Sequence, residues 1–169
     1  MILIKPSYSN YDNIFFDYKI NLIDGKTLEL SKYSDHLVLL VNTASYCGFT
    51  KQYDDLQKLW EIYKEKKFLV IAIPSNSFNQ EKNSNSDIKD FCETNFNITF
   101  PISSLSSVKG NDAHKIYKWA LLNYGKSTIP KWNFHKILIG KDGKIIDTFA
   151  SFTNPLSKKI LKIIDEELN

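Results

Sequence analysis

The chain has 169 residues, a formal net charge of +3 and a composition that is 43% hydrophobic and 24% charged, which is typical of one soluble globular domain. All 22 basic residues are lysines, so the arginine fork that recognises guanine and phosphate is absent, and we expect no nucleic-acid partner. No apolar run reaches the roughly 20 residues that a membrane span requires, so we expect no membrane partner either.

The N-terminus and the cysteine count indicate the compartment. The first 20 residues lack a basic segment, a continuous apolar segment and a small-residue cleavage site, so we read no signal peptide and expect a cytoplasmic protein. Cys47 and Cys92 are too few for a disulfide scaffold. The histidines are too scattered for a zinc site, and we interpret His114 and His135 as ordinary surface or loop residues.

Hydrophobic periodicity and turn residues predict the secondary structure. In chain order we expect a hairpin turn at Asp24-Gly25, a strand at 36–43, a helix at 49–66, a strand at 68–73 ended by Pro74, a Ser- and Asn-rich surface loop at 75–86, helices from about 86 and at 111–124, a hairpin at 136–150 turning at Asp142-Gly143, and a helix at 153–168. The predicted helix caps are Ser86, Asn111 or Asp112, and Thr153 or Asn154.

The order of these elements predicts the fold. A strand, a helix and a second fully apolar strand indicate a parallel pair covered on both faces. A later hairpin adds antiparallel strands. We therefore expect one α/β domain over residues 1–169, with its core at about 14–168 and a central mixed β-sheet flanked by helices in a thioredoxin-like arrangement.

The stretch VNTASYCGFT, residues 41–50, places Cys47 where a buried strand leads into a helix. We expect Cys47 in the first turn of that helix, where unpaired N–H groups and the helix dipole favour negative charge. Both effects lower the pKa of a thiol, and the thiolate is the nucleophile. Gly48 leaves room for a substrate. From position alone, a buried and inert cysteine is an equal alternative.

The sequence LVNTASYCGFTKQYDDLQKLWEIY resembles the signature of the glutathione peroxidase family in its cysteine-containing form. The likeness continues in order through IPSNSFNQE, IKDFCETNFNITFPI, GNDAHKIYKWAL and KWNFHKILIGKDGKII. This resemblance implies a peroxidase that needs no cofactor or metal and reduces hydrogen peroxide and organic hydroperoxides. Cys47 would attack one peroxide oxygen and become a sulfenic acid.

The resemblance also implies hydrogen-bond donors for the thiolate. Trp132 and Asn133, in KWNFHK, match two of them, since an indole N–H only donates and an amide NH2 donates twice. Without that context, Trp132 would read as a core aromatic. Where the family carries Gln in Cys-Asn-Gln-Phe, this chain has Ser77, to which we assign the role, with Gln80 as a rival. The shorter side chain predicts slower turnover.

Regeneration of the thiol is the last implied step. Cys92 stands where relatives carry a resolving cysteine, whose disulfide thioredoxin reduces. The alternative is a core residue, because Cys92 shares an apolar stripe with Ile88. Basic residues would hold the carboxylates of glutathione, and only Lys51 and Lys131 could lie nearby, so we favour thioredoxin over glutathione as the reductant. The short connection NYGKSTIP resembles that of monomeric members, and we expect a monomer.

Two functions of other classes stay open. A redox relay would pass a Cys47–Cys92 disulfide to a partner protein instead of cycling for defence. A binding module without chemistry would require Cys47 to keep the ordinary thiol pKa of about 8.5 and to consume no peroxide.

Overall fold

The computed structural model describes residues 11–169. A four-stranded sheet has the order β4–β3–β5–β6, and a two-stranded sheet pairs β1 with β2. The strands are β1 (Lys19–Asn21), β2 (Thr27–Glu29), β3 (Leu37–Thr43), β4 (Phe68–Pro74), β5 (Lys136–Ile139) and β6 (Ile145–Phe149). The helices are α1 (Gln52–Tyr63), α2 (Asn85–Phe96), α3 (Lys115–Tyr124) and α4 (Lys158–Leu168). The predicted α/β fold is confirmed.

The central sheet is mixed, as predicted. Strand β3 pairs in parallel with β4 and antiparallel with β5, and β5 pairs antiparallel with β6. Every residue of β3 and β4 is buried, because helices cover both faces of the sheet. Pro74, predicted to follow the strand, is its last residue, and the edge position of β4 tolerates the missing N–H.

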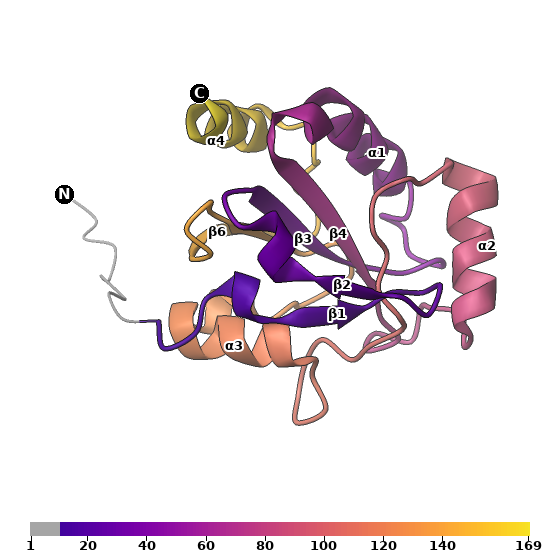
Figure 1. Ribbon diagram of the computed structural model, residues 1–169. Helices are drawn as coiled ribbons and strands as arrows, with labels where there is room; N and C mark the ends of the chain where they lie inside the picture. Colours follow the sequence, from indigo (N-terminus) through magenta and orange to yellow (C-terminus); the bar gives the residue numbers. More distant parts are fainter. Residues whose placement is uncertain (1–10) are drawn as a thin grey trace.

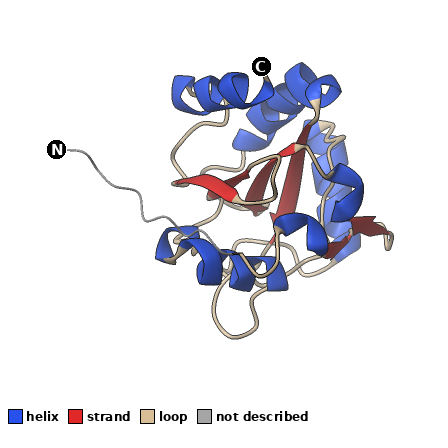
Figure 2. Cartoon of the chain, turned by 60° about the vertical axis from the view of Figure 1, so that its left-hand side comes forward, coloured by secondary structure: helices blue, strands red, loops and turns tan. Residues whose placement is uncertain are grey.

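The helices lie on both faces of the sheet. Figure 1 shows α1 and α4 on one side of β3 and β4, with α3 and the β1–β2 hairpin on the other. Alternate residues of β3 divide between two cores: Leu39 packs with α1 and α4, and Leu40 with α3. Figure 2, turned by 60°, shows the same strands enclosed between helices. The site therefore has to form at an end of this sheet.

Glycines complete both predicted hairpins. Gly25 (φ +85°) lies between β1 and β2, and Gly143 (φ +77°) lies between β5 and β6, a conformation that glycine adopts without strain. At Gly143 the neighbouring chain is also close, since a Cβ there would lie 2.9 Å from the Cβ of Ile14. Both turn predictions are confirmed.

The caps of α2 and α4 differ from the predicted ones. Ser84, rather than Ser86, caps α2, and its hydroxyl accepts the backbone N–H of the third helical residue at 3.1 Å. Ser157 caps α4, where Thr153 or Asn154 was expected. The Asn154 side chain instead accepts the N–H two residues later, at 2.7 Å, and forms a turn before the helix.

Helix α3 begins later than predicted. Asn111 and Asp112 lie in a turn, and His114 is the N-cap, with its ring Nδ1 accepting the Ile116 N–H at 3.2 Å. His114 thus lies in the loop before the helix, as predicted, and it also caps the helix. Within residues 11–169, no helix is long and apolar enough to cross a membrane. The predicted lack of a signal peptide depends partly on residues 1–10, which lie outside the described residues.

Candidate active site

Cys47 lies in a bend after β3, five residues before the first residue of α1, Gln52. The prediction that it occupies the first turn of the helix is wrong. The side chain of Thr50 provides the physical reason. Its hydroxyl accepts the Cys47 N–H at 3.0 Å and donates to the Ala44 carbonyl at 2.9 Å, which folds the segment into a compact turn before the helix starts. We call residues 44–51 the thiol loop.

The hydrogen bond to the sulfur comes from this turn. The Phe49 N–H donates to the Cys47 Sγ, with an N–S distance of 3.4 Å. The first N–H groups of α1, those of Gln52 and Tyr53, donate instead to the carbonyls of Phe49 and Thr50. A turn amide therefore replaces the helix-end donors of the prediction. The sulfur that accepts this bond belongs to a half-buried free thiol.

A second loop, residues 75–84, which we call the Gln80 loop, holds the thiol loop. The Ser45 N–H donates to Oε1 of Glu81 at 3.1 Å, and the Tyr46 N–H donates to the carbonyl of Gln80 at 2.9 Å. Two consecutive N–H groups of one loop thus bond to two consecutive residues of the other. Gln80 is thereby held beside the residue that precedes Cys47.

Asn133 joins this arrangement from the segment before β5. It is fully buried, and its Nδ2 donates to Oε1 of Gln80 at 2.9 Å. Its turn is bonded to β3, because the Phe134 N–H donates to the Asn42 carbonyl at 2.6 Å and Asn42 Nδ2 donates to the Trp132 carbonyl at 3.1 Å. Since Asn133 occupies Oε1 of Gln80, the NH2 of that amide remains available as a donor.

Ser77 takes part in a different set of contacts. Its hydroxyl receives a hydrogen bond from Ser75 at 2.9 Å, accepts the Val108 N–H at 3.1 Å and lies 3.3 Å from the hydroxyl of Ser107. In the described part of the chain these bonds connect Ser77 to residues 75 and 107–108 and not to the thiol loop. The structure brings Gln80, the rival candidate, to Asn133, and it does not bring Ser77 there.

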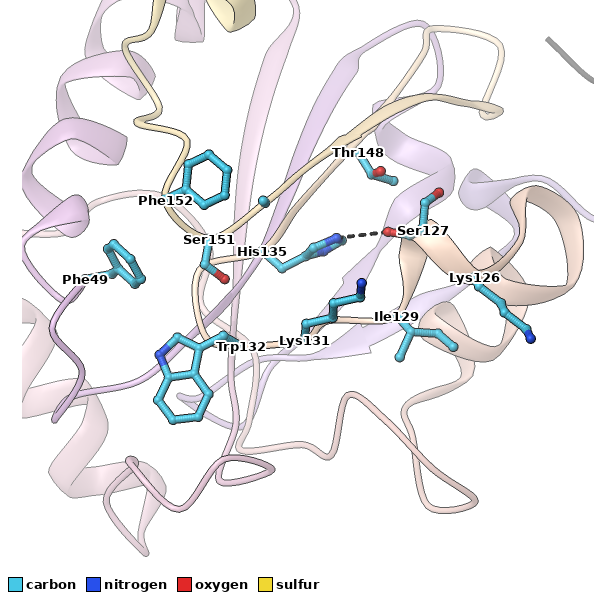
Figure 3. A pocket seen from close by; sticks show the side chains of 11 residues that line it. Phe49, Lys126, Ser127, Ile129, Lys131, Trp132, His135, Thr148, Ser151 and Phe152 are labelled. Atoms are coloured by element: carbon cyan, nitrogen blue, oxygen red, sulfur yellow. Dashed lines mark hydrogen bonds between the residues drawn. The ribbon is translucent and has the colours of Figure 1, made fainter.

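A cavity of about 470 Å³ lies beside the thiol loop. Figure 3 shows Phe49, Trp132 and Phe152 along one side of it. Trp132 is 38% exposed and packs against Phe78, with ring centroids 5.3 Å apart, so it is a wall residue and not a core aromatic. Lys131 also lines the cavity. The cavity is therefore bordered by aromatic side chains and by a cation.

His135 lines the same cavity; it lies in the loop before β5, as predicted, but it is buried and not a surface residue. The side chain is 8% exposed, and Nε2 lies 3.0 Å from the Ser127 carbonyl, the dashed line in Figure 3. Burial lowers the pKa of His135 to about 4. The imidazole is therefore neutral at pH 7 and contributes no cation to the cavity.

Cys92 lies in α2 and is fully buried. As predicted, it shares the buried stripe of that helix with Ile88, and both belong to the core between α1 and the sheet. Burial raises the pKa of the Cys92 thiol to about 11, so the thiol is protonated at neutral pH. Both cysteines are free in this structure, and α2 is intact around Cys92.

Comparisons with known proteins agree with one another. Residues 15–121 match the family model of glutathione peroxidase. The glutathione peroxidase homolog BsaA of Halalkalibacterium halodurans is 40% identical over 146 residues, which cover 85% of this chain and 93% of that protein. The hydroperoxy fatty acid reductase gpx1 of Synechocystis sp. is 35% identical over 153 residues, covering 85% and 90%.

A solved structure gives the same result for the fold. The crystal structure of Trgpx in its apo form has a TM-score of 0.70 with this chain at 37% sequence identity, and the match covers 93% of this chain and 96% of that one. The predicted thioredoxin-like fold is thus confirmed by both the comparison and the strand order.

Proposed function

This chain belongs to the glutathione peroxidase family and is a peroxidase that reduces hydroperoxides, and from that premise we propose that Cys47 is its peroxidatic residue. The observation that supports the proposal most directly is the Phe49 N–H bonded to the sulfur of a half-buried Cys47. The aromatic wall of the cavity that Phe49 lines would exclude water from a bound organic hydroperoxide.

The first step is a displacement at oxygen. The Cys47 thiolate forms an S–O bond with one peroxide oxygen while the O–O bond breaks, so sulfur is oxidised and the peroxide is reduced. The leaving oxygen takes a proton and departs as water or an alcohol. Cys47 is left as a sulfenic acid.

Donors around the sulfur would stabilise the charge that moves during this step. We assign this role to the Gln80 amide, Asn133 and the indole N–H of Trp132. The bond from Asn133 to Oε1 of Gln80 supports Gln80 over Ser77 in this role, because it leaves the Gln80 NH2 free to donate. With Gln80 in place, the serine at position 77 is no reason to expect slow turnover.

Regeneration requires a second thiol. We propose that Cys92 attacks the sulfenic sulfur, forms a Cys47–Cys92 disulfide and releases water, and that thioredoxin then reduces the disulfide. Two cysteines whose Cα atoms are more than about 7 Å apart cannot be bridged without backbone movement. Because Cys92 is buried within α2, this step requires local opening of that helix. Lys131, on the cavity, supports glutathione as the competing reductant.

One assay tests these steps together. Consumption of hydrogen peroxide and of an organic hydroperoxide is followed through NADPH oxidation, with thioredoxin and its reductase or glutathione and its reductase. Wild type, Cys47→Ser and Cys92→Ser are compared. We expect Cys47→Ser to be inactive, and Cys92→Ser to form a sulfenic acid trapped by dimedone without sustained turnover by thioredoxin.

The alternatives give different results in the same assay. Activity retained in Cys47→Ser would exclude Cys47 as the nucleophile. Turnover of Cys92→Ser with glutathione at the wild-type rate would assign reduction to glutathione. One equivalent of peroxide consumed without continuing NADPH oxidation would indicate a redox relay. Size-exclusion chromatography of the same samples tests the proposed monomer.

A further inference from the structure

We propose that Glu81 is a positioning residue whose carboxylate ties the thiol loop to the Gln80 loop and so holds Gln80 in place beside Cys47. This inference rests on the proposed function, since it concerns the geometry of the same site. It assigns a role to a buried acid that takes no part in the steps described above.

The contacts of Glu81 connect the two loops through a single atom. Its Oε1 accepts the Ser45 N–H at 3.1 Å from the thiol loop and the Lys82 N–H at 2.7 Å from its own loop. The residue is 6% exposed, although the segment 75–86 was predicted to be a surface loop. Hydrogen bonds between a charged acceptor and backbone N–H groups are among the stronger ones in proteins.

An ion pair does not account for the burial of this acid. The amine of Lys82 donates to the Tyr46 hydroxyl at 2.6 Å and lies 4.6 Å above that ring. Among the described residues, Glu81 forms no salt bridge, and its Oε2 is buried without a hydrogen-bond partner. Burial accordingly raises the pKa of Glu81. Burying an acid without an ion-pair partner is costly, and acids of this kind are concentrated at functional sites.

Two adjacent backbone N–H groups of the thiol loop connect it to the Gln80 loop, in addition to the exposed side-chain bond from Lys82 to the Tyr46 hydroxyl. Beside the Glu81 bond, the Tyr46 N–H donates to the Gln80 carbonyl at 2.9 Å. Without the carboxylate, the Tyr46 N–H would be the one backbone donor still joining the two loops, beside the exposed side-chain bond from Lys82 to the Tyr46 hydroxyl. Buried N–H groups would lose their acceptor at about 1–3 kcal/mol each. The Gln80 amide, which bonds Asn133, would then shift relative to the sulfur. A misplacement of about 1 Å at a reacting centre can reduce the rate about 100-fold.

Three substitutions of Glu81 test separately its acceptor oxygen, the length of its side chain and its charge. Glu81→Gln keeps an acceptor oxygen and removes the charge, and we expect it to retain most of the peroxidase activity. Glu81→Leu removes the acceptor at similar volume, and we expect kcat/KM for hydroperoxide to fall about 100-fold. Glu81→Asp keeps the charge but shortens the side chain, and we expect a loss of activity there too. If Glu81→Leu does not fold, the activity of Glu81→Asp tests the proposal instead.

A double-mutant cycle with Gln80→Ala distinguishes positioning from a general loss of stability. If Glu81 acts through Gln80, Glu81→Leu has little further effect on kcat/KM in the Gln80→Ala background. Additive losses would overturn the proposal, and so would wild-type activity in both Glu81→Leu and Glu81→Asp. Glu93→Gln, which removes an exposed carboxylate on α2, is the matched control and should have no effect.

A second readout does not depend on turnover. The rate at which iodoacetamide alkylates Cys47 is measured in the native protein, and we expect Glu81→Leu to change it and Glu81→Gln to leave it close to that of the wild type. An inactive wild type would contradict the proposed function while this readout still tested the loop connection. An unchanged rate in Glu81→Leu would overturn the proposal for Glu81.

Discussion

Cys47 lies half buried in a bend after β3, whereas Cys92 is fully buried in the middle of α2. A turn amide bonds the sulfur of Cys47, while Cys92 is packed against apolar side chains and its pKa is raised to about 11. The same residue type is thus partly exposed and hydrogen-bonded in one place and packed into the core in the other. Access and hydrogen bonding, rather than residue type, determine the difference.

The largest expected effect is in the alkylation rates of the two thiols. In the native protein at pH 8, we expect iodoacetamide to modify Cys47 at least about 1000-fold faster than Cys92, because Cys92 reacts only when the structure opens. Mass spectrometry of the two cysteine peptides measures the ratio. In guanidinium chloride the two rates should become similar. Comparable rates in the native protein would contradict the burial of Cys92.

Serine substitution should separate the two positions by stability. Cys92→Ser places a hydroxyl in an apolar core, and we expect the free energy of unfolding to fall by about 1–3 kcal/mol. Cys47→Ser should change it by about 0.5 kcal/mol or less, because that side chain is half exposed. Urea unfolding measures both values. Equal losses would show that the two sites do not differ in packing.

The amine of Lys136 shows that burial also changes the titration of a basic side chain. Lys136 on β5 is fully buried, and its Nζ donates to the carbonyls of Phe134 at 2.6 Å and Ser151 at 3.4 Å. Burial lowers its pKa to about 7, from 10.5. The unfolded chain therefore binds more protons between these two values.

Stability should accordingly depend on pH. We expect the free energy of unfolding to rise between pH 7 and 10.5 by up to about 1.4 kcal/mol per pH unit from this group. Below pH 7 the amine is charged in both states, and this contribution to the slope disappears. Urea unfolding from pH 6 to 9 measures the slope, and Lys136→Met should flatten it. Parallel curves for the two proteins would rule out titration of Lys136.

The smallest effect concerns the opening of α2. Ser84→Ala removes the cap bond at 3.1 Å, which should destabilise α2 by about 1 kcal/mol. If Cys92 is exposed by local opening, its alkylation rate rises about 5-fold, while that of Cys47 stays the same. Ser157→Ala, which removes the corresponding bond at α4, is the matched control. An equal increase in both variants would indicate global opening instead.

Much of the fold could be predicted from the sequence because its signals are local. Continuous apolar runs predicted β3 and β4, and Asp-Gly pairs predicted both hairpins. The starts of the helices were less accurate, since several side chains in a row could cap and only one does, as Ser84 beside Ser86 shows. The turn before α1 depends on the Thr50 hydroxyl bonding in two directions, a contact that periodicity does not reveal.

The candidate site was predictable only in part. The position of Cys47 at the end of a strand follows from local pattern. The choice between Ser77 and Gln80 depends on a contact with Asn133, 53 residues further along the chain, and no spacing within one loop can decide it. Glu81, His135 and Lys136 are polar or charged residues that a sequence reading assigns to the surface. Their burial results from tertiary packing alone.

Strand β4 lies at the edge of the central sheet, and the segment that follows α2 covers it. The Ala72 N–H donates to the Pro101 carbonyl at 3.0 Å, the Ser103 N–H donates to the Ala72 carbonyl at 2.9 Å, and the Ser106 N–H donates to the Pro74 carbonyl at 2.9 Å. Exposed strand edges are templates on which other chains add and aggregate. These three bonds lie outside α2, so they do not depend on that helix. If α2 unwound to bring Cys92 to an oxidised Cys47, the edge of β4 would stay covered, and that strand edge would not be exposed to other molecules.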